Sequence, residues 1–255
     1  MSWHCDLADQ AILVTGASSG LGAHFAGVLA RCGARVVAAA RRREALDRVV
    51  GAIAAAGGRA DAVVLDVTDA ASVADAVAEA ERLTGGLTGL LNCSGVTETV
   101  RLLDQTEASW DRILDTNLKG TWLATAEVGR RMAARGAGGA IVNVASILGL
   151  RQGGQVTAYA TSKAAVVQLT KQSALELARF GIRVNALAPG YIETDLNRDF
   201  FESEPGKALI ARIPQRRLGR LEDLDAPLAL LFSPAAAYMT GSVLTVDGGH
   251  LLGSL

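Results

Sequence analysis

The sequence contains few of the residues that hold disulfide-rich or zinc-dependent proteins together. Its 255 residues include three cysteines and three histidines. The cysteines lie far apart at Cys5, Cys32 and Cys93, and they form no Cys-x-x-Cys pair. We therefore expect neither a disulfide framework nor a metal site, and we predict that the cysteines act as small buried hydrophobic residues.

A large net charge and a long apolar run are also missing. The chain has 25 Lys and Arg against 26 Asp and Glu, for a net charge of -1. This balance argues against a nucleic acid or an anionic membrane as partner. No apolar run approaches the ~20 residues of a membrane helix, and the N-terminus has no basic region followed by an apolar stretch. We expect a cytoplasmic protein with a small-molecule substrate.

Short apolar runs alternate with helix-like segments along the chain. The runs predicted as strands are Ala11–Thr15, Arg35–Ala40, Ala62–Leu65, Leu87–Leu91, Ala140–Val144, Ile182–Leu187 and Val243–Val246. Between them, helices are predicted at 45–56, 72–83, 110–135, from 157 onward, and at 222–232. This alternation predicts an α/β fold: one Rossmann-type domain over residues 1–255, with a doubly wound parallel sheet of about seven strands and helices on both faces. Residues 195–220 lack a strand pattern, and we expect a substrate lid at about 191–215.

A glycine loop, Gly16-Ala-Ser-Ser-Gly-Leu-Gly22, joins the first strand to the first predicted helix. Its glycines allow a tight turn and close approach of a ligand to the backbone. The helix that follows offers free N–H groups and the positive end of its dipole to a pyrophosphate. Strand, glycine loop and helix together predict a dinucleotide site, although a purely structural turn would have the same local pattern.

The end of the second strand indicates which dinucleotide binds. Nicotinamide enzymes specific for NAD(H) usually carry an acidic residue there, which binds the ribose hydroxyls. This chain has Ala40 at that place and Arg41 beside it. A guanidinium suits a 2′-phosphate, so NADP(H) is predicted rather than NAD(H).

Three reactive residue types lie where the period changes from strand to helix. Tyr159 and Lys163 are four residues apart near the start of a predicted helix, so they share one face. A nearby ammonium lowers the pKa of a phenol, which would let Tyr159 exchange protons near neutral pH. Ser146, at the end of the preceding strand, can hold a carbonyl or alcohol oxygen against Tyr159. Taken alone, the Tyr and Lys pair could equally be an exposed surface pair on a helix.

These motifs together resemble the classical short-chain dehydrogenase/reductase family over almost the whole chain. The segment Thr15 to Gly22 matches its TGxxxGxG cofactor motif, and Asn117, Ser146, Tyr159 and Lys163 match its catalytic tetrad. The residues predicted to contact the cofactor, from the loop, the second strand and the resemblance together, are Gly16, Ser18, Ser19, Gly20, Leu21, Gly22, Arg41, Asp66, Val67, Asn92, Gly95, Tyr159, Lys163, Pro189, Gly190, Ile192 and Thr194.

The resemblance also implies a mechanism. Tyr159 would be the general acid in reduction and the base in oxidation, with Lys163 lowering its pKa and binding the nicotinamide ribose. Asn117 would hold, through its backbone, a water that links Lys163 to solvent. The chain departs from the family's Asn-Asn-Ala-Gly at Asn92-Cys-Ser-Gly95, where the cysteine removes an amide that helps stabilise the central sheet.

The sequence is compatible with two classes of substrate. One is a free ketone or secondary alcohol. The other is a 3-oxoacyl-(acyl-carrier-protein), whose acidic carrier would need basic residues at the pocket mouth, such as Arg130, Arg131 and Arg179. A third hypothesis is a non-catalytic NADP(H) sensor or scaffold, because a fold does not fix a function. The resemblance further implies a homotetramer or homodimer, with the apolar end Leu251-Leu252-Gly-Ser-Leu255 at a subunit contact.

Overall fold

A parallel sheet of seven strands forms the centre of the computed structural model, which describes residues 5–193 and 198–253. The strands lie in the order β3-β2-β1-β4-β5-β6-β7. They are β1 (Ala11–Thr15), β2 (Arg35–Ala40), β3 (Arg59–Val64), β4 (Gly89–Asn92), β5 (Gly139–Val144), β6 (Ile182–Pro189) and β7 (Val243–Val246). The chain winds outward first on one side of β1 and then on the other. The predicted fold class is thus confirmed, and the reversal between β1 and β4 marks the crevice where such folds bind ligands.

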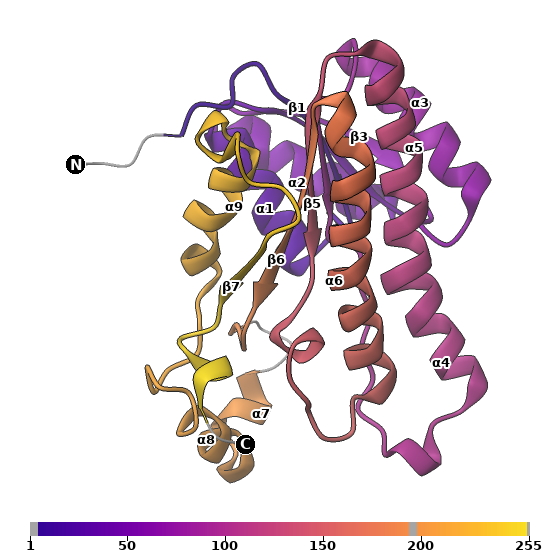
Figure 1. Ribbon diagram of the computed structural model, residues 1–255. Helices are drawn as coiled ribbons and strands as arrows, with labels where there is room; N and C mark the ends of the chain where they lie inside the picture. Colours follow the sequence, from indigo (N-terminus) through magenta and orange to yellow (C-terminus); the bar gives the residue numbers. More distant parts are fainter. Residues whose placement is uncertain (1–4, 194–197, 254–255) are drawn as a thin grey trace.

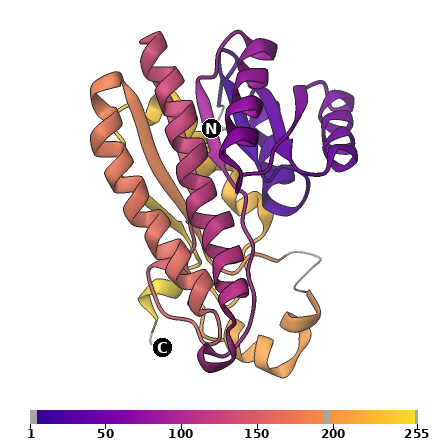
Figure 2. The same cartoon turned by 90° about the vertical axis from the view of Figure 1, so that its right-hand side faces the viewer.

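Helices cover both faces of the sheet (Figures 1 and 2). One face carries α1 (Gly20–Arg31), α2 (Arg43–Ala55) and α9 (Asp225–Phe232). The other carries α3 (Ala70–Thr84), α5 (Gly120–Arg135) and α6 (Thr157–Leu177), with α4 (Glu107–Leu114) continuing the line of α5. Because side chains of a strand alternate between faces, Ile12 and Val14 join the core under α1 while Leu13 joins the core under α3. This double burial explains why the strands read as continuous apolar runs.

The ends of α3 and α4 follow local rules of the sequence. The Asp69 carboxylate accepts a hydrogen bond from the Ala71 N–H, at 2.9 Å, where α3 begins. Gly85 ends the same helix in the left-handed conformation, with φ of 82°. Thr106 caps α4 by accepting from the Ser109 N–H at 3.2 Å. Capping residues rather than the apolar pattern therefore set these boundaries.

Several predicted elements have different bounds in the structure. β3 starts at Arg59, three residues before the prediction, and an ion pair of 3.0 Å between Arg35 and Asp61 joins it to β2. The helix predicted at 110–135 is two α-helices joined by a π-helical turn, η2 (Asp115–Lys119). Residues 195–220, predicted as irregular, contain α7 (Arg198–Glu202) and α8 (Glu204–Ile210). The last predicted helix begins with a 3-10 turn, η5 (Leu221–Leu224).

Short 3-10 turns complete the described chain. They are η1 (Leu102–Asp104), η3 (Ile147–Gly149), η4 (Ala178–Phe180), η6 (Pro234–Ala236) and η7 (His250–Leu252). None of the helices within residues 5–193 and 198–253 has the length and apolar character that a membrane crossing requires.

Candidate active site

The predicted site residues converge at the carboxyl ends of the strands. The loops after β1, β4, β5 and β6 carry the glycine loop, Gly95, Ser146 and Gly190 in turn. The Thr15 hydroxyl oxygen accepts from the backbone N–H of Cys93, at 3.1 Å, and of Ser94, at 3.2 Å. The glycine loop and the loop after β4 are therefore joined directly, through a residue that the motif contains but that was not itself predicted as a site residue.

The glycine loop can take a nucleotide because its backbone is closely packed on one side and open on the other. A Cβ added to Gly16 would lie 2.8 Å from the Ser94 Cα, and one added to Gly22 would lie 2.3 Å from the Gly16 carbonyl oxygen. At Gly20, with φ of 54°, nothing in the described chain lies within 4 Å of such a Cβ. Ser19 precedes α1 without a side-chain cap, which leaves the N–H groups of the first turn available. This cradle fits a dinucleotide pyrophosphate.

We expect Gly22→Ala to destroy the loop. The added methyl group would overlap the Gly16 carbonyl, whereas Gly27→Ala on the same helix would meet only the end of the flexible Arg31 side chain at 3.4 Å. Gly27→Ala should stabilise the fold by about 0.5–1 kcal/mol through helix propensity, and Gly22→Ala should lower the unfolding temperature and abolish dinucleotide binding. Thermal unfolding and fluorescence titration with NADPH measure both. Unchanged NADPH binding by Gly22→Ala would contradict the assignment of the loop.

Arg41, Arg42 and Asp66 surround the place predicted for the adenosine. The Asp66 carboxylate accepts from the Thr68 N–H at 3.0 Å and its hydroxyl at 2.8 Å, and these bonds, with Arg41 nearby, lower the pKa of Asp66. Arg41 is exposed, and Arg42 donates to the Ser18 hydroxyl at 3.3 Å. No local pattern singles out Arg42, because its contact with Ser18 depends on how the two loops meet.

Two predicted cofactor residues turn their side chains into the protein. Val67 is buried, and it lies where a side chain at Gly120 would have to go. The Asn92 amide donates to the Thr125 hydroxyl at 3.0 Å and to the Asn143 Oδ1 at 2.8 Å. Contact of either residue with a cofactor would therefore have to come from its backbone. The Asn92 Oδ1 itself is buried and has no hydrogen-bond partner in the described part of the chain.

Ser146, Tyr159 and Lys163 form one group between β5 and α6, in which Tyr159 is partly exposed. Ser146 and Lys163 are each less than a tenth exposed. The Ser146 hydroxyl is within hydrogen-bonding reach of the Tyr159 phenol. The Lys163 ammonium donates to the Val144 carbonyl at 2.7 Å and lies 5.8 Å from the centre of the Tyr159 ring.

The protonation of this group differs from the sequence-based expectation. Burial raises the pKa of Tyr159, the hydrogen bond from Ser146 lowers it in part, and Lys163 is not among the groups that shift it. Burial also lowers the pKa of Lys163 to about 8. The physical reason is that burial removes water from both groups and so disfavours the charged form of each, the phenolate of Tyr159 and the ammonium of Lys163. Tyr159 is accordingly a protonated phenol at neutral pH, which suits a proton donor.

Asn117 occupies the π-helical turn between α4 and α5. Its side chain is fully buried and bonds to the backbone of Val96 in both directions, with Oδ1 accepting at 2.8 Å and Nδ2 donating at 2.9 Å. Nδ2 also donates to the Ser162 hydroxyl at 3.0 Å, which links the turn to α6. A side chain at Gly95 would contact both Asn117 and Lys163. The turn thus places Asn117 beside the candidate catalytic group, and π-helical turns are frequent at functional sites.

The buried lysine predicts how stability depends on pH. Between about pH 8 and the ordinary lysine pKa of 10.5, the unfolded chain binds a proton at Lys163 that the folded chain does not. The free energy of unfolding should therefore rise with pH across this window, by up to about 3 kcal/mol. Urea unfolding of wild type and Lys163→Met at several pH values isolates this effect from Cys5 and Cys93, whose raised pKa values act in the opposite sense. Parallel curves for the two proteins would refute the prediction.

The segment predicted to meet the nicotinamide follows β6. Gly190 is required there, since a Cβ would lie 2.7 Å from the Asp247 Cα. Ile192 forms an isolated bridge with Gly219, which fixes the segment to the loop after α8. Thr194 and Leu196, predicted for the cofactor and the lid, lie outside the described residues.

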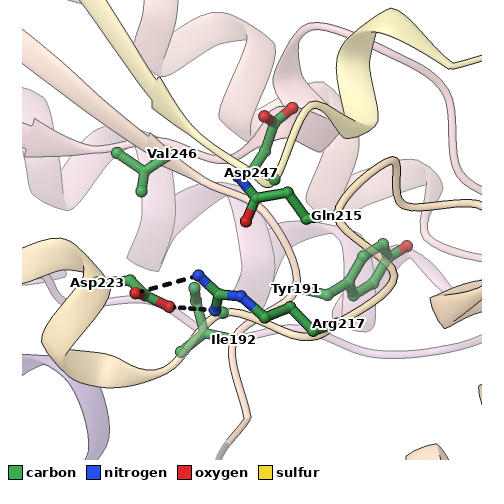
Figure 3. Close-up of a pocket in the computed structure, with 9 residues that line it drawn as sticks. Tyr191, Ile192, Gln215, Arg217, Asp223, Val246 and Asp247 are labelled. Atoms are coloured by element: carbon green, nitrogen blue, oxygen red, sulfur yellow. Dashed lines mark hydrogen bonds and ion pairs between the residues drawn. The ribbon is translucent and has the colours of Figure 1, made fainter.

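A cavity of about 160 Å³ lies behind this segment (Figure 3). Its walls are formed by Tyr191, Ile192, Gln215, Arg217, Gly219, Asp223, Val246, Asp247 and Gly248. The Arg217 guanidinium points at Asp223 and donates to both carboxylate oxygens, at 2.6 and 3.3 Å. The tetrad residues are not part of these walls. Because the Arg217 and Asp223 charges are already paired with each other, we interpret the cavity as lying next to the candidate active site and not as the site itself.

The three arginines that were predicted to contact a carrier protein lie at the amino ends of the strands, opposite the candidate active site. Arg130 and Arg131 are near the end of α5, and Arg179 follows α6, where β5 and β6 begin. Arg131 pairs with Glu127 at 2.7 Å and with Glu81 at 3.1 Å. Their predicted place at the pocket mouth is therefore wrong. The reason is that helices of a parallel α/β fold run antiparallel to the strands, so their ends point away from the site.

The described structure was also searched for side chains of the types that bind metal ions. Within the described ranges, no three His, Cys, Asp or Glu side chains group as ligands of an ion would.

The sequence is similar to those of known oxidoreductases over almost its whole length. The family model described as enoyl-(acyl carrier protein) reductase matches residues 16–250. A galactitol 2-dehydrogenase (L-tagatose-forming) of Cereibacter sphaeroides is 39% identical over 240 residues, 93% of each chain. The 3-oxoacyl-(acyl-carrier-protein) reductase FabG of Thermotoga maritima is 37% identical over 246 residues, which is 96% of this chain and 99% of the relative.

Solved structures agree in fold. A protein of Sinorhizobium meliloti 1021 that is described as a short-chain alcohol dehydrogenase is 39% identical, with a TM-score of 0.93 over 98% of this chain and 99% of its own. A gluconate 5-dehydrogenase of Burkholderia cenocepacia J2315, solved in complex with NADP and tartrate, is 33% identical, with a TM-score of 0.93 over 98% of each chain.

Proposed function

The chain belongs to the short-chain dehydrogenase/reductase family of oxidoreductases, and we therefore propose that it transfers hydride between NADP(H) and a ketone or secondary alcohol. The observation that carries the proposal is the group in which Ser146 reaches the Tyr159 phenol while Lys163 is anchored on the Val144 carbonyl. A phenol and a hydroxyl aimed at one point are what a carbonyl oxygen needs in order to be held and protonated.

The proposed mechanism assigns one step to each residue. Ser146 holds the carbonyl oxygen, and Tyr159 donates its phenolic proton to that oxygen in reduction. In oxidation the same phenol, as phenolate, takes the proton back. Lys163 then supplies positive charge beside the phenolate, and Asn117 holds, through its backbone, a water on the path to solvent. Reduced nicotinamide, when bound, supplies the hydride.

NADP(H) is favoured over NAD(H) by the end of β2. Arg41 is exposed at that point, and Ala40 offers no carboxylate to the ribose hydroxyls. A protein of Agrobacterium tumefaciens that is described as a 2-deoxy-D-gluconate 3-dehydrogenase, 38% identical, was solved with bound NADP. We propose that this chain acts in the cytoplasm as one domain, with residues 191–215 covering the substrate.

The proposal is tested by measuring the initial rate at which the absorbance of the reduced nicotinamide changes. The panel pairs NADPH and NADH in turn with a sugar ketone, a steroid ketone, an aromatic ketone and an acetoacetyl thioester. Turnover of a free ketone with NADPH is the expected result. Turnover of the thioester alone would favour the acyl-carrier-protein reading, to which the Thermotoga maritima relative points. Binding of NADPH without turnover of any substrate would favour the sensor hypothesis.

We further propose a homotetramer or homodimer formed through α5, α6 and the C-terminal segment. Trp122 on α5 is 51% exposed, Leu175 on α6 is 75% exposed, and Leu252 is 90% exposed. Apolar side chains left in water at these places favour association. Small-angle scattering gives the mass directly, and a monomer would contradict the proposal.

A further inference from the structure

Arg151 is joined to the catalytic serine by a short turn. Ser146 precedes η3, where its hydroxyl oxygen accepts from the Leu148 N–H at 3.1 Å. The turn continues to Arg151, whose N–H donates to the Ile147 carbonyl at 2.9 Å. Arg151 therefore lies within about one turn of the residue proposed to hold the substrate oxygen, and it is the only charged residue between Ala145 and Val156.

The Arg151 side chain crosses to the C-terminal turn. Its Nη1 donates to the backbone carbonyl of His250. The His250 ring is buried and lies against Tyr191, with ring centres 5.5 Å apart. Tyr191 in turn is close enough to Tyr159 to affect its pKa. Burial raises the pKa of Tyr191, and Arg151 is close enough to offset part of that rise. Arg151, Tyr191 and His250 thus form a wall beside the catalytic tyrosine, built from the loop after β5, the loop after β6 and the C-terminal turn.

Arg151 forms no ion pair with the acidic residues that the structure describes around it. Asp247 uses its carboxylate oxygens on the N–H groups of Gly249, at 2.9 Å, and Leu251, at 2.8 Å. Glu98, on the loop after β4, is paired with Arg112 at 2.9 Å. Within the described chain Arg151 makes no ion pair, and its one bond to a carbonyl leaves further N–H donors of the guanidinium free.

His250 adds no second positive charge to the wall. Burial, together with Arg151 and Arg212, lowers the pKa of His250, so its ring is neutral at physiological pH. Its Nδ1 is buried and has no hydrogen-bond partner in the described residues. One guanidinium with free donors and a neutral polar ring suit a monoanionic carboxylate better than a dianionic phosphate.

We infer that Arg151 binds a carboxylate of the substrate, so that the enzyme prefers hydroxy or oxo acids to neutral ketones. This inference rests on the proposed function, since it names the substrate class for the same site. Arg151 is then a specificity-determining residue, and Tyr191 and His250 form the wall that supports it.

A matched pair of ketones tests the inference. The rates of 4-oxopentanoate and its methyl ester, with saturating NADPH, compare a carboxylate with a neutral group of similar shape. We expect wild type to prefer the acid, and Arg151→Gln to lower kcat/KM for the acid at least tenfold through KM while changing the ester less than twofold. Arg179→Gln, with the same charge change at the far edge of the sheet, should behave as wild type. An Arg151→Lys variant, which keeps the charge, should fall between wild type and Arg151→Gln.

Two results would overturn the inference. One is a wild type that reduces the ester as well as the acid, and the other is an equal loss for both ketones in Arg151→Gln with Arg151→Lys restoring both. If neither ketone is reduced, the ketone panel still tests the proposed function, and calorimetric titration of the NADPH-loaded protein with 4-oxopentanoate decides the inference separately. Binding by wild type that is lost in Arg151→Gln supports it, and no binding by wild type overturns it.

Discussion

Tyr159→Phe should lower kcat by about 10²–10⁴-fold, because the phenol is the group proposed to donate the proton. The variant keeps the ring and loses only the hydroxyl, so the packing of the start of α6 is preserved. Its affinity for NADPH should stay within about twofold of wild type, since the Lys163 ammonium remains on the Val144 carbonyl. Steady-state rates and fluorescence titration with NADPH measure the two quantities.

Ser146→Ala and Tyr238→Phe complete this experiment. Ser146→Ala removes the hydroxyl that reaches the phenol, and we expect a large loss of kcat here too. Tyr238 is fully exposed, and Tyr238→Phe should leave every rate unchanged. Turnover by Tyr159→Phe at the wild-type rate would rule out the proton-donor role.

Local patterns predicted the parts of the site that depend on neighbours in sequence. The glycine loop followed from three glycines between a strand and a helix, and Gly16 and Gly22 indeed have no space for a side chain. Tyr159 and Lys163 followed from helical spacing. The sheet followed from apolar runs, because burial on both faces leaves few positions for polar residues.

Features that depend on contacts between distant segments could not be predicted. The π-helical turn around Asn117 is held by bonds to Val96 and Ser162, which lie 21 and 45 residues away. Arg151 meets His250 across 99 residues, and no periodicity indicates such a pair. The pKa of Tyr159 was predicted in the wrong direction because spacing shows a neighbouring charge and does not show burial, which is the larger effect here.

Arg41→Ala should weaken NADPH binding by about 10–100-fold and leave NADH binding unchanged. The physical reason is that hydrogen bonds to charged groups are worth about 1.5–3 kcal/mol, and only NADPH has the 2′-phosphate that would accept them. Arg41 is exposed and stands near Asp66, so its removal should not unfold the protein. Fluorescence titrations of wild type and Arg41→Ala with NADPH and with NADH give the affinities.

The run of three arginines supplies its own controls. Arg43 pairs with Asp47 at 2.8 Å on the surface of α2, so Arg43→Ala should change neither affinity. Arg42 donates to Ser18 on the glycine loop, so Arg42→Ala should weaken NADPH binding less than Arg41→Ala does. A wild type that binds NADH as tightly as NADPH would contradict the cofactor assignment. An Arg41→Ala variant that loses both cofactors equally would instead mean that this guanidinium supports the loop, because a contact with the 2′-phosphate cannot affect a cofactor that lacks one.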